Sequence, residues 1–183
     1  MLPTEIIEKT LGVEGKYSNN PADSGGETMW GITVATARAN GYTGPMKAMP
    51  RDVAIGIYNR EYFVKPHFDK VWQVNHRIAD ELFDSGVNCG QRTASSWLQT
   101  ALNVLNREGK DYPDLLVDGD IGGKTLAALQ TFIRLRKLEG EIVLLKILNT
   151  LQGAYYVNLA TQRKKDEAFI FGWFRNRVEL VFR

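Results

Sequence analysis

The amino-acid sequence predicts a mainly helical fold of the α+β class, with one small irregular hairpin in its N-terminal part. Apolar residues recur at three- and four-residue intervals along most of the 183 residues, which is the spacing of buried helix faces. Residues 16–33 break this pattern with a run of asparagine, proline, aspartate, serine and glycine, which is typical of turns. The 44% of apolar and 24% of charged residues are those of a globular protein that can build its own core.

Each expected helix follows from its apolar spacing and from the residues that start or stop it. The expected helices are a short one around residues 6–11, then 33–39, a helix from Pro50 to Pro66, and 78–86, 93–105, 122–136, 141–161 and 173–181. A loop over 107–119 separates two of them. No linker rich in proline, glycine or serine divides the chain, so we expect an N-terminal lobe of residues 1–90 packed against a helical lobe of residues 91–183.

Composition excludes several classes of protein. The single cysteine, Cys89, excludes an intramolecular disulfide framework and any cysteine-rich zinc site. A formal net charge of +2 is too small to indicate a nucleic-acid binder. The most apolar stretch, 142–148, is short and contains Lys146, so it is typical of a buried helix and not of a membrane span.

Glu14 is the first candidate for a catalytic group. It stands at the end of the first expected helix, beside Gly15, which suits the position after a helix C-terminus. The last turn of a helix carries the negative pole of the helix dipole, and burial against Tyr17 or Trp30 would further disfavour ionisation. Both effects would raise the pKa of Glu14, as a general acid near neutral pH requires. On position alone, an exposed glutamate that tolerates a small penalty is the simpler interpretation.

A second carboxylate, Asp23, follows nine residues later across a turn-rich stretch that can double back. Glycosidases place two carboxyl groups on either side of the bond that they cleave, one as acid and one as base or nucleophile. Thr28 adds a hydroxyl that could help Asp23 hold a water molecule. Asp23 is also consistent with a turn residue that caps its own loop, and Thr28 with an ordinary loop threonine.

Three consecutive motifs make this region similar to a known family. They are Glu14-Gly-Lys-Tyr17, Asn20-Pro-Ala-Asp23-Ser-Gly-Gly26 and Thr28-Met-Trp-Gly-Ile-Thr33. The motifs resemble the start of the glycoside hydrolase family 108 endolysins, which are N-acetylmuramidases of phage and prophage origin, also known as secretion activator proteins. The resemblance implies a lysozyme-like fold and places the catalytic acid of the Glu-Gly-Gly-Tyr motif on Glu14. The departures from the family pattern, at Lys16, Ser24 and Met29, remove no ionisable catalytic group.

A more distant similarity concerns spacing. The order of Glu14, Asp23 and Thr28, at offsets of nine and fourteen residues, is similar to the Glu-Asp-Thr triad of phage-type lysozymes. This similarity implies that Asp23 is the base that activates water and that Thr28 is its partner. Tyr17 and Trp30 lie within the same motifs and are expected to contact the substrate.

The second half resembles the predicted peptidoglycan-binding domain that follows the catalytic region in this family. The similarity rests on the segments 98–103 and 117–129. Asp118 and Gly119 are expected to form a tight turn before a helix. A helix–turn–helix without a ligand explains the same residues. Asp118 and Asp120 do not complete a calcium loop, which needs further oxygen ligands and a distal glutamate.

The remaining residues with reactive side chains favour packing over catalysis. Cys89 with His67 or His76 would be the parts of a thiol hydrolase, but Cys89 follows an apolar helix, where a lone buried cysteine is the commoner case. The two histidines lack the spacing of a zinc site, and we expect no metal or other cofactor.

Aromatic and amide side chains are further candidates for substrate contacts. Four aromatic residues could stack on sugar rings: Trp30, Tyr62, Trp72 and Trp97. At most one or two of them are expected in a cleft, because most aromatic residues at helical spacing belong to the core. Asn88 lies in a segment similar to the family's Asp-x-x-Val-Asn. It is expected to brace the cleft floor with Asp84, one helical turn earlier, and is also a candidate substrate contact.

Together these features predict a peptidoglycan hydrolase that cleaves the MurNAc-β-1,4-GlcNAc bond, with Glu14 as acid and with Asp23 and Thr28 positioning water. A lytic transglycosylase and a non-catalytic peptidoglycan-binding or secretion-accessory module are the alternatives. The expected partner is the glycan strand and not nucleic acid, and the expected state is a monomer. The N-terminus lacks the basic start and apolar run of a signal peptide. We therefore expect synthesis in the cytoplasm, no stable membrane insertion, and action on the periplasmic or cell-wall peptidoglycan after release.

Overall fold

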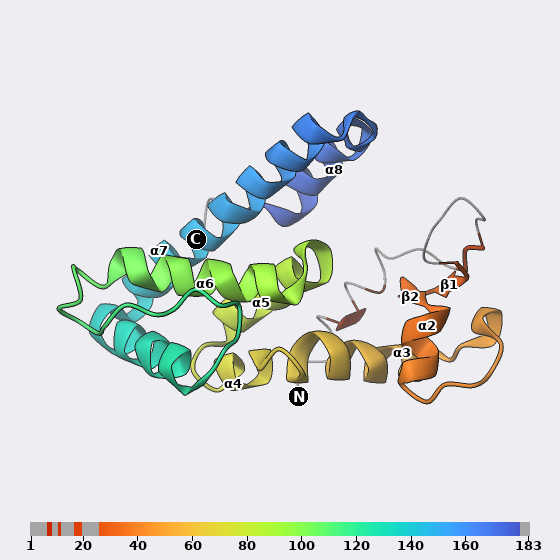
Figure 1. Cartoon of the computed structure of the whole chain (residues 1–183), viewed down its shortest axis with the longest axis horizontal. Coiled ribbons are helices and arrows are strands. Elements are labelled where there is room, and N and C mark those ends of the chain that lie inside the picture. The colour runs from red at the N-terminus through yellow and green to blue at the C-terminus, as the bar shows by residue number, and fades with distance from the viewer. Residues whose placement is uncertain (1–6, 9–10, 12–16, 20–25, 180–183) are drawn as a thin grey trace. The chain divides into compact units, whose positions relative to one another are not determined.

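The computed structural model describes residues 7–8, 11, 17–19 and 26–179, and the chain divides into two units, Met1–Lys65 and Pro66–Arg183. The predicted fold class, mainly helical with a small antiparallel hairpin, is confirmed (Figure 1). Each unit is built around its own buried apolar residues and is described by itself below.

The first unit contains the hairpin and a set of short helices. Its elements are β1 (Thr28–Met29), β2 (Ile32–Thr33), α2 (Val34–Ala39), the 3-10 helix η1 (Met46–Ala48), α3 (Arg51–Tyr58) and the π-helix η2 (Asn59–Val64). Of the first expected helix, residues 7, 8 and 11 are helical, and the rest lies outside the described residues. The buried apolar side chains come from every part of the unit: Ile7, Leu11, Ile32, Ala37, Met46, Met49, Ala54, Ile57, Tyr58 and Phe63.

Helix α2 begins and ends where the sequence predicts. The Thr33 hydroxyl caps its N-terminus by accepting a hydrogen bond from the Thr36 amide at 3.2 Å. The helix stops at Asn40, and Gly41 follows with a φ of 83°, a left-handed conformation that glycine adopts at little cost. The chain can therefore turn away directly after the predicted Asn-Gly stop signal.

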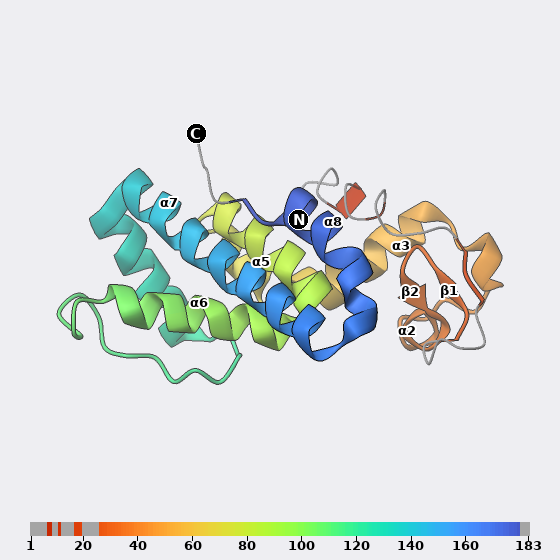
Figure 2. The same ribbon diagram turned by 90° about the horizontal axis from the view of Figure 1, so that it is seen from above.

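The second unit is a helical bundle. Its elements are α4 (Phe68–Trp72), α5 (His76–Cys89), α6 (Gln91–Leu105), α7 (Gly123–Gln162), the 3-10 helix η3 (Lys164–Asp166) and α8 (Glu167–Arg177). Helices α5, α6 and α7 pack against one another (Figure 2). Their buried faces meet in a core that includes Ile78, Leu82, Phe83, Leu98, Leu102, Leu129, Phe132, Leu144, Leu145 and Leu148.

Helix α7 contains a break at Lys137, which has a φ of 52° and a ψ of −141°. The two parts run in different directions (Figure 1). Gly140 lies just after the break and is buried; a Cβ there would come within 2.2 Å of the Arg136 Cβ, so this close approach requires glycine. The break falls between the helices expected at 122–136 and 141–161.

The structure differs from the predicted helices at two places. Helix α4 was not predicted, because five residues are too few to show a period. The last helix was predicted at 173–181; residues 173–177 are helical, but the predicted bounds are wrong. Helix α8 spans Glu167–Arg177 and ends because Val178 leaves the helical conformation, with a φ of −99° and a ψ of 103°.

A row of amide side chains on α6 holds the loop that leads to α7. Asn106 donates to the Asp114 carboxylate at 2.6 Å and accepts from the Gly109 amide at 3.0 Å. Asn103 exchanges two hydrogen bonds, of 2.9 and 2.8 Å, with the backbone of Leu115. Further along, Gln99 accepts from the Gly119 amide at 2.9 Å and donates to Asp118 at 2.8 Å. These side chains supply the partners that the loop backbone would otherwise find in regular secondary structure.

No helix among the described residues combines the length and the apolar character that a membrane crossing needs.

Candidate active site

The hairpin turns through Trp30 and Gly31, whose φ values are 57° and 74°. Left-handed conformation at both central residues defines the tight turn that matches the twist of a two-residue hairpin. Glycine suits this position, whereas a bulky residue such as Trp30 is strained there and is tolerated only when its surroundings hold it. Two hydrogen bonds do so: Trp30 Nε1 donates to the Met49 carbonyl at 3.2 Å, and the Tyr58 hydroxyl donates to the Trp30 carbonyl at 3.1 Å.

A third segment of chain pairs with the hairpin. Ser18 and Thr28 exchange two backbone hydrogen bonds, of 3.0 and 2.8 Å, and Thr28 pairs with Thr33 on its other side. Paired residues of neighbouring antiparallel strands direct their side chains to the same face, so Ser18, Thr28 and Thr33 share one face. The bridge closes the loop between Ser18 and Thr28. The predicted catalytic residues Glu14 and Asp23 lie outside the described residues, and Thr28 is half-buried.

Tyr17 interacts with Glu27. A hydrogen bond to the Glu27 carboxylate is the main cause that raises the pKa of Tyr17, and desolvation and the negative charge of Glu27 act in the same direction. The ammonium group of Lys47 lies over the Tyr17 ring, 5.9 Å from its centroid. Tyr17 is half-buried, so part of its surface stays accessible to solvent.

Trp30 carries a second cation on its ring. The guanidinium carbon of Arg51 lies 5.5 Å from the Trp30 centroid. Trp30 is half-buried and its indole N–H is held by the Met49 carbonyl, so the orientation of the ring is fixed. The structure thus brings together three of the predicted site residues: Thr28 lies in the hairpin, Trp30 lies in its turn, and Tyr17 precedes Ser18, which pairs with Thr28.

Asn88 belongs to the second unit. Its side chain donates to the Asp84 carbonyl at 2.7 Å, within α5. The Asp84 carboxylate accepts from Gln152 at 3.0 Å and from Arg177 at 2.8 Å, so it ties α5 to α7 and to the end of α8. A bracing role agrees with these bonds, and a substrate contact by Asn88 stays a prediction.

Glu81 is a perturbed acid that sequence reasoning missed. Burial is the main cause that raises the pKa of Glu81 to about 7, and the negative charge of Asp84 adds to it. Hydrogen bonds from Asn149 at 2.8 Å and Ser85 at 3.2 Å act in the opposite direction but do not outweigh burial. The sequence signal was a polar stripe at 81, 84, 85 and 88 beside the apolar face that residues 78, 79, 82, 83 and 86 form.

Replacement of Glu81 by glutamine should stabilise the protein at alkaline pH. The folded-state pKa of Glu81 lies above its unfolded value of 4.5, so the folded state is most stable when this carboxyl is protonated. The contribution of Glu81 to the free energy of unfolding therefore falls as the pH rises from about 4.5 to 7. Glutamine removes this loss, so at pH 8 the variant should gain up to about 3 kcal/mol, since one unit of pKa corresponds to about 1.4 kcal/mol. Denaturant unfolding at pH 5 and pH 8 measures the difference. Glu139→Gln, at an exposed position of α7, is the control; an equal gain there would remove Glu81 as the cause.

Cys89 is unsuited to nucleophilic catalysis. Burial raises the pKa of the Cys89 thiol to about 12, and the thiolate is the reactive form. The histidines make other contacts: His67 Nδ1 lies 2.8 Å from the Ile121 carbonyl, and His76 stacks on Trp72 at 4.0 Å. In the part of the chain that the structure describes, no three histidine, cysteine, aspartate or glutamate residues are grouped so that they could hold a metal ion.

Two of the remaining candidate aromatic residues pack on other rings. Tyr62 stacks on Tyr58 with centroids 5.2 Å apart, and Trp97 meets Tyr155 edge to face at 5.8 Å. Tyr62 and Trp97 therefore pack against other aromatic side chains, and Trp30 is the candidate best placed to contact a sugar.

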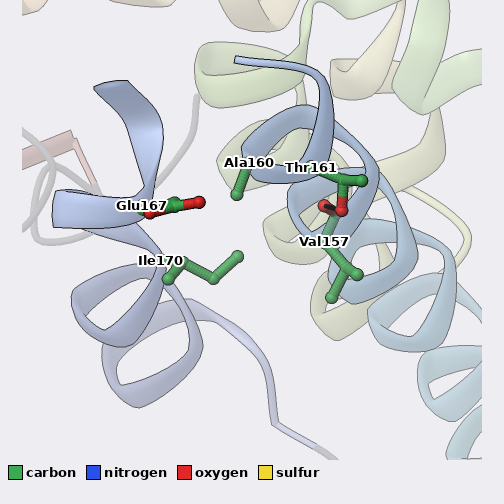
Figure 3. A pocket seen from close by; sticks show the side chains of 5 residues that line it. All are labelled: Val157, Ala160, Thr161, Glu167 and Ile170. Carbon is green, nitrogen blue, oxygen red and sulfur yellow. Dashed lines mark hydrogen bonds between the residues drawn. The ribbon is translucent and has the colours of Figure 1, made fainter. Parts of the chain in front are cut away.

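A small pocket lies between the end of α7 and the start of α8 (Figure 3). Its volume is about 190 Å³, and it is lined by Val157, Ala160, Thr161, Glu167 and Ile170. Ligand sites usually enclose about 300–1,000 Å³. The pocket is therefore too small for a disaccharide unit and is not assigned to the glycan.

Comparison with known proteins identifies the class. Residues 7–90 match the family described as "Glycosyl hydrolase 108", and residues 93–178 match the family described as "Predicted Peptidoglycan domain". The chain is therefore a glycoside hydrolase directed at peptidoglycan. Its N-terminal part is a glycosyl hydrolase 108 domain, which is followed by a predicted peptidoglycan domain, and the resemblance seen in the sequence is confirmed on both points.

A solved structure supports the whole-chain similarity. The chain is similar to a protein in "Structure of Brucella abortus SagA", with 26% sequence identity and a TM-score of 0.65 over 93% of this chain and 86% of that chain. No curated protein matches the chain. The two family matches divide the chain between residues 90 and 93, whereas packing divides it at residues 65 and 66 because α4 and α5 pack with the bundle. The predicted lobes, 1–90 and 91–183, stay a prediction.

Proposed function

We propose that the chain is an N-acetylmuramidase that hydrolyses the MurNAc-β-1,4-GlcNAc bond, with Glu14 as general acid and with Asp23 and Thr28 positioning the attacking water. The observation that carries this proposal is the match of residues 7–90 to glycosyl hydrolase 108, which covers all three residues. A glycosidase needs two carboxyl groups near one bond. Glu14 and Asp23 are the carboxylates of the motifs that gave the resemblance.

The pairing of Ser18 with Thr28 supports this assignment. Glu14 precedes Tyr17 by three residues, so their Cα atoms can be at most about 11 Å apart, given the reach of an extended chain. Asp23 lies within the loop that the Ser18–Thr28 bridge closes, and Thr28 is part of the bridge itself. Glu14 and Asp23 each lie within five residues, along the sequence, of a residue of that bridge.

In the proposed reaction, the Glu14 carboxyl donates its proton to the glycosidic oxygen as the bond from that oxygen to C1 of MurNAc breaks. Positive charge develops at C1 and the ring oxygen. A water molecule held by Asp23 and the Thr28 hydroxyl forms the new bond to C1, and Asp23 accepts the proton that this water loses. GlcNAc leaves as the alcohol and MurNAc becomes the new reducing end. Every step is supplied by side chains and water, so the proposal needs no cofactor.

The second half supports the choice of polymer. Because residues 93–178 match a predicted peptidoglycan domain, we propose that this part binds the glycan strand that the first unit cleaves. We further propose that the protein is a monomer of the endolysin type and of phage or prophage origin. It would be made in the cytoplasm and reach the wall only after release.

Digestion of purified peptidoglycan by the full chain tests the proposal. Released fragments are reduced with borohydride and analysed by mass spectrometry. A muramidase gives reduced muramic acid at each new end and fragments that have gained one water. Fragments with an anhydro end and no added water would instead identify a lytic transglycosylase. Binding to the walls without any new end would identify a non-catalytic module.

The stereochemistry of the product should show inversion. A base that acts through water leaves the two carboxyl groups about 6.5–9.5 Å apart, whereas a nucleophile approaches to about 5–5.5 Å and gives retention. The Thr28 hydroxyl can orient a water but has no evident role in a covalent mechanism, so we expect the α anomer first from the β-linked strand. Chromatographic separation of the anomers directly after cleavage decides. A predominantly β first product would make Asp23 the nucleophile.

The same mechanism sets an order among variants. Asp23→Ala should lose most activity and Thr28→Ala less, while Thr28→Ser keeps the hydroxyl and should keep most activity. Initial rates on peptidoglycan measure the series. Equal losses in Thr28→Ser and Thr28→Ala would show that the hydroxyl does not hold the water.

A further inference from the structure

The segment from η1 to the start of α3 is fixed against the hairpin. Met46 and Met49 are buried, and the Met49 carbonyl accepts the hydrogen bond from the Trp30 indole at 3.2 Å. Between and after these anchors the segment exposes two cations, Lys47 and Arg51. The anchors therefore hold both cations beside the hairpin.

Each cation lies on an aromatic residue of the predicted site. Lys47 Nζ is 5.9 Å from the Tyr17 centroid, and the Arg51 guanidinium carbon is 5.5 Å from the Trp30 centroid. A guanidinium that lies over a ring keeps its N–H donors directed outward, where they can bind a carboxylate with two hydrogen bonds. Stacking thus orders the donor before a ligand arrives and lowers the entropy lost on binding.

Within the part of the chain that the structure describes, both cations lack an acidic partner. Among the described residues, neither Lys47 nor Arg51 forms an ion pair, and the Arg51 guanidinium reaches only the Glu8 carbonyl, at 3.5 Å. The nearby Glu27 carboxylate accepts a hydrogen bond from Tyr17. Other described cations of the unit have partners: Lys65 pairs with Glu61, Arg38 donates to backbone carbonyls, and Arg60 donates to a side-chain amide oxygen.

We propose that Lys47 and Arg51 form a carboxylate subsite that binds the acidic substituent of muramic acid. Every second sugar of a peptidoglycan strand carries a lactyl group, which ends either in its own carboxylate or in a peptide with carboxylates further out. Tyr17 and Trp30 would face the sugar, and the two cations would bind the carboxylate beside it. The inference rests on the proposed function and deepens it, because it makes the enzyme prefer acidic strands over neutral ones such as chitin.

The test measures binding, so that it does not depend on turnover. The full chain with Glu14→Gln is titrated by calorimetry with three glycans of equal length. These are peptide-bearing strands, strands stripped of peptide so that the lactyl carboxylate is free, and stripped strands whose carboxylates have been converted to methylamides. The variants are Lys47→Gln with Arg51→Gln, the charge-keeping Lys47→Arg, and a control with the same change of charge, Arg60→Gln with Lys65→Gln. Melting curves establish that each variant is folded.

The double variant at positions 47 and 51 should bind carboxylate-bearing strands about five- to tenfold more weakly, as expected for losing two ion pairs at a partly exposed surface. Its affinity for methylamide strands should equal that of the parent, and the control and Lys47→Arg should bind like the parent. Weakening with peptide-bearing strands alone places the carboxylate in the peptide, and weakening with stripped strands alone places it on the lactyl group. Weakening with both acidic strands shows that the subsite accepts either carboxylate. Equal weakening on all three glycans, or none, overturns the subsite. If the wild type does not cleave peptidoglycan but the binding results are as expected, the proposed function is overturned and the carboxylate subsite is not.

Discussion

Replacement of Glu14 by glutamine should abolish cleavage of peptidoglycan and leave the fold intact. Glutamine has nearly the same size as glutamate but cannot donate the proton that the leaving oxygen needs. General acid catalysis contributes on the order of 10²–10⁴ in rate, so residual activity should fall to about 1% or less. Initial rates of release of reducing ends from purified walls measure the effect. If the variant keeps more than about a tenth of wild-type activity, the loss is smaller than general acid catalysis predicts, and Glu14 is not the acid.

The control for this experiment comes from the same stretch of chain. Glu8 is exposed and helical, and Glu8→Gln should keep full activity. The sequence predicts that Glu14 stands at the end of a helix, where an ionised carboxylate opposes the helix dipole. The stability of Glu14→Gln should therefore be unchanged or slightly higher near pH 7, by about 0.3–1 kcal/mol. A melting temperature several degrees below that of the wild type would show that Glu14 has a structural role instead.

Replacement of Gly119 by alanine should cost about 2–3 kcal/mol of stability, because it combines a left-handed backbone with a steric clash. Gly119 is buried and has a φ of 76°. An added Cβ would lie 2.9 Å from the Arg92 carbonyl oxygen, a backbone atom that cannot move aside without shifting α6. The same shift would strain the hydrogen bond from the Gly119 amide to Gln99. Denaturant unfolding of the full chain measures the loss.

Gly109 offers a matched control in the same loop. Its φ of 77° is almost identical, but an added Cβ there would have nothing within 4 Å. Gly109→Ala should therefore cost about 1 kcal/mol, from the backbone conformation alone. If both variants lose the same stability, the close approach to Arg92 contributes nothing.

Much of the helical fold could be predicted because its signals are local. The stop at Asn40 and Gly41 and the division of α7 near Lys137 follow from residues at those positions. The last helix could not be placed in the same way. Phe169, Ile170, Phe171, Trp173 and Phe174 give α8 apolar residues on several faces, so no period marks its start. Its position depends instead on contacts with α7, such as the stacking of Trp173 on Tyr156 at 5.0 Å.

The candidate site shows the same distinction. Tyr17, Thr28 and Trp30 could be predicted because the motifs lie close together in the sequence, and the Ser18–Thr28 bridge joins the segment that follows Tyr17 to the hairpin. The raised pKa of Glu81 could not be foreseen, because it depends on burial against helices that are far away in the sequence.

The positions of Lys47 and Arg51 could not be foreseen for a related reason. They depend on the hydrogen bond between Trp30 and the Met49 carbonyl, which no sequence pattern encodes.

The amide row on α6 also has a consequence for susceptibility to proteases. A loop without regular structure is ordinarily the first place where a protease cuts, because its backbone opens at little cost. Here Asn103 and Gln99 hold the backbone of the loop, so opening the segment around Leu115 and Gly119 means giving up bonds to α6 itself. We therefore expect that part of the loop and the helix to open as one cooperative unit. In this loop, side-chain hydrogen bonds give the resistance to proteolysis that backbone hydrogen bonds give in a strand or helix.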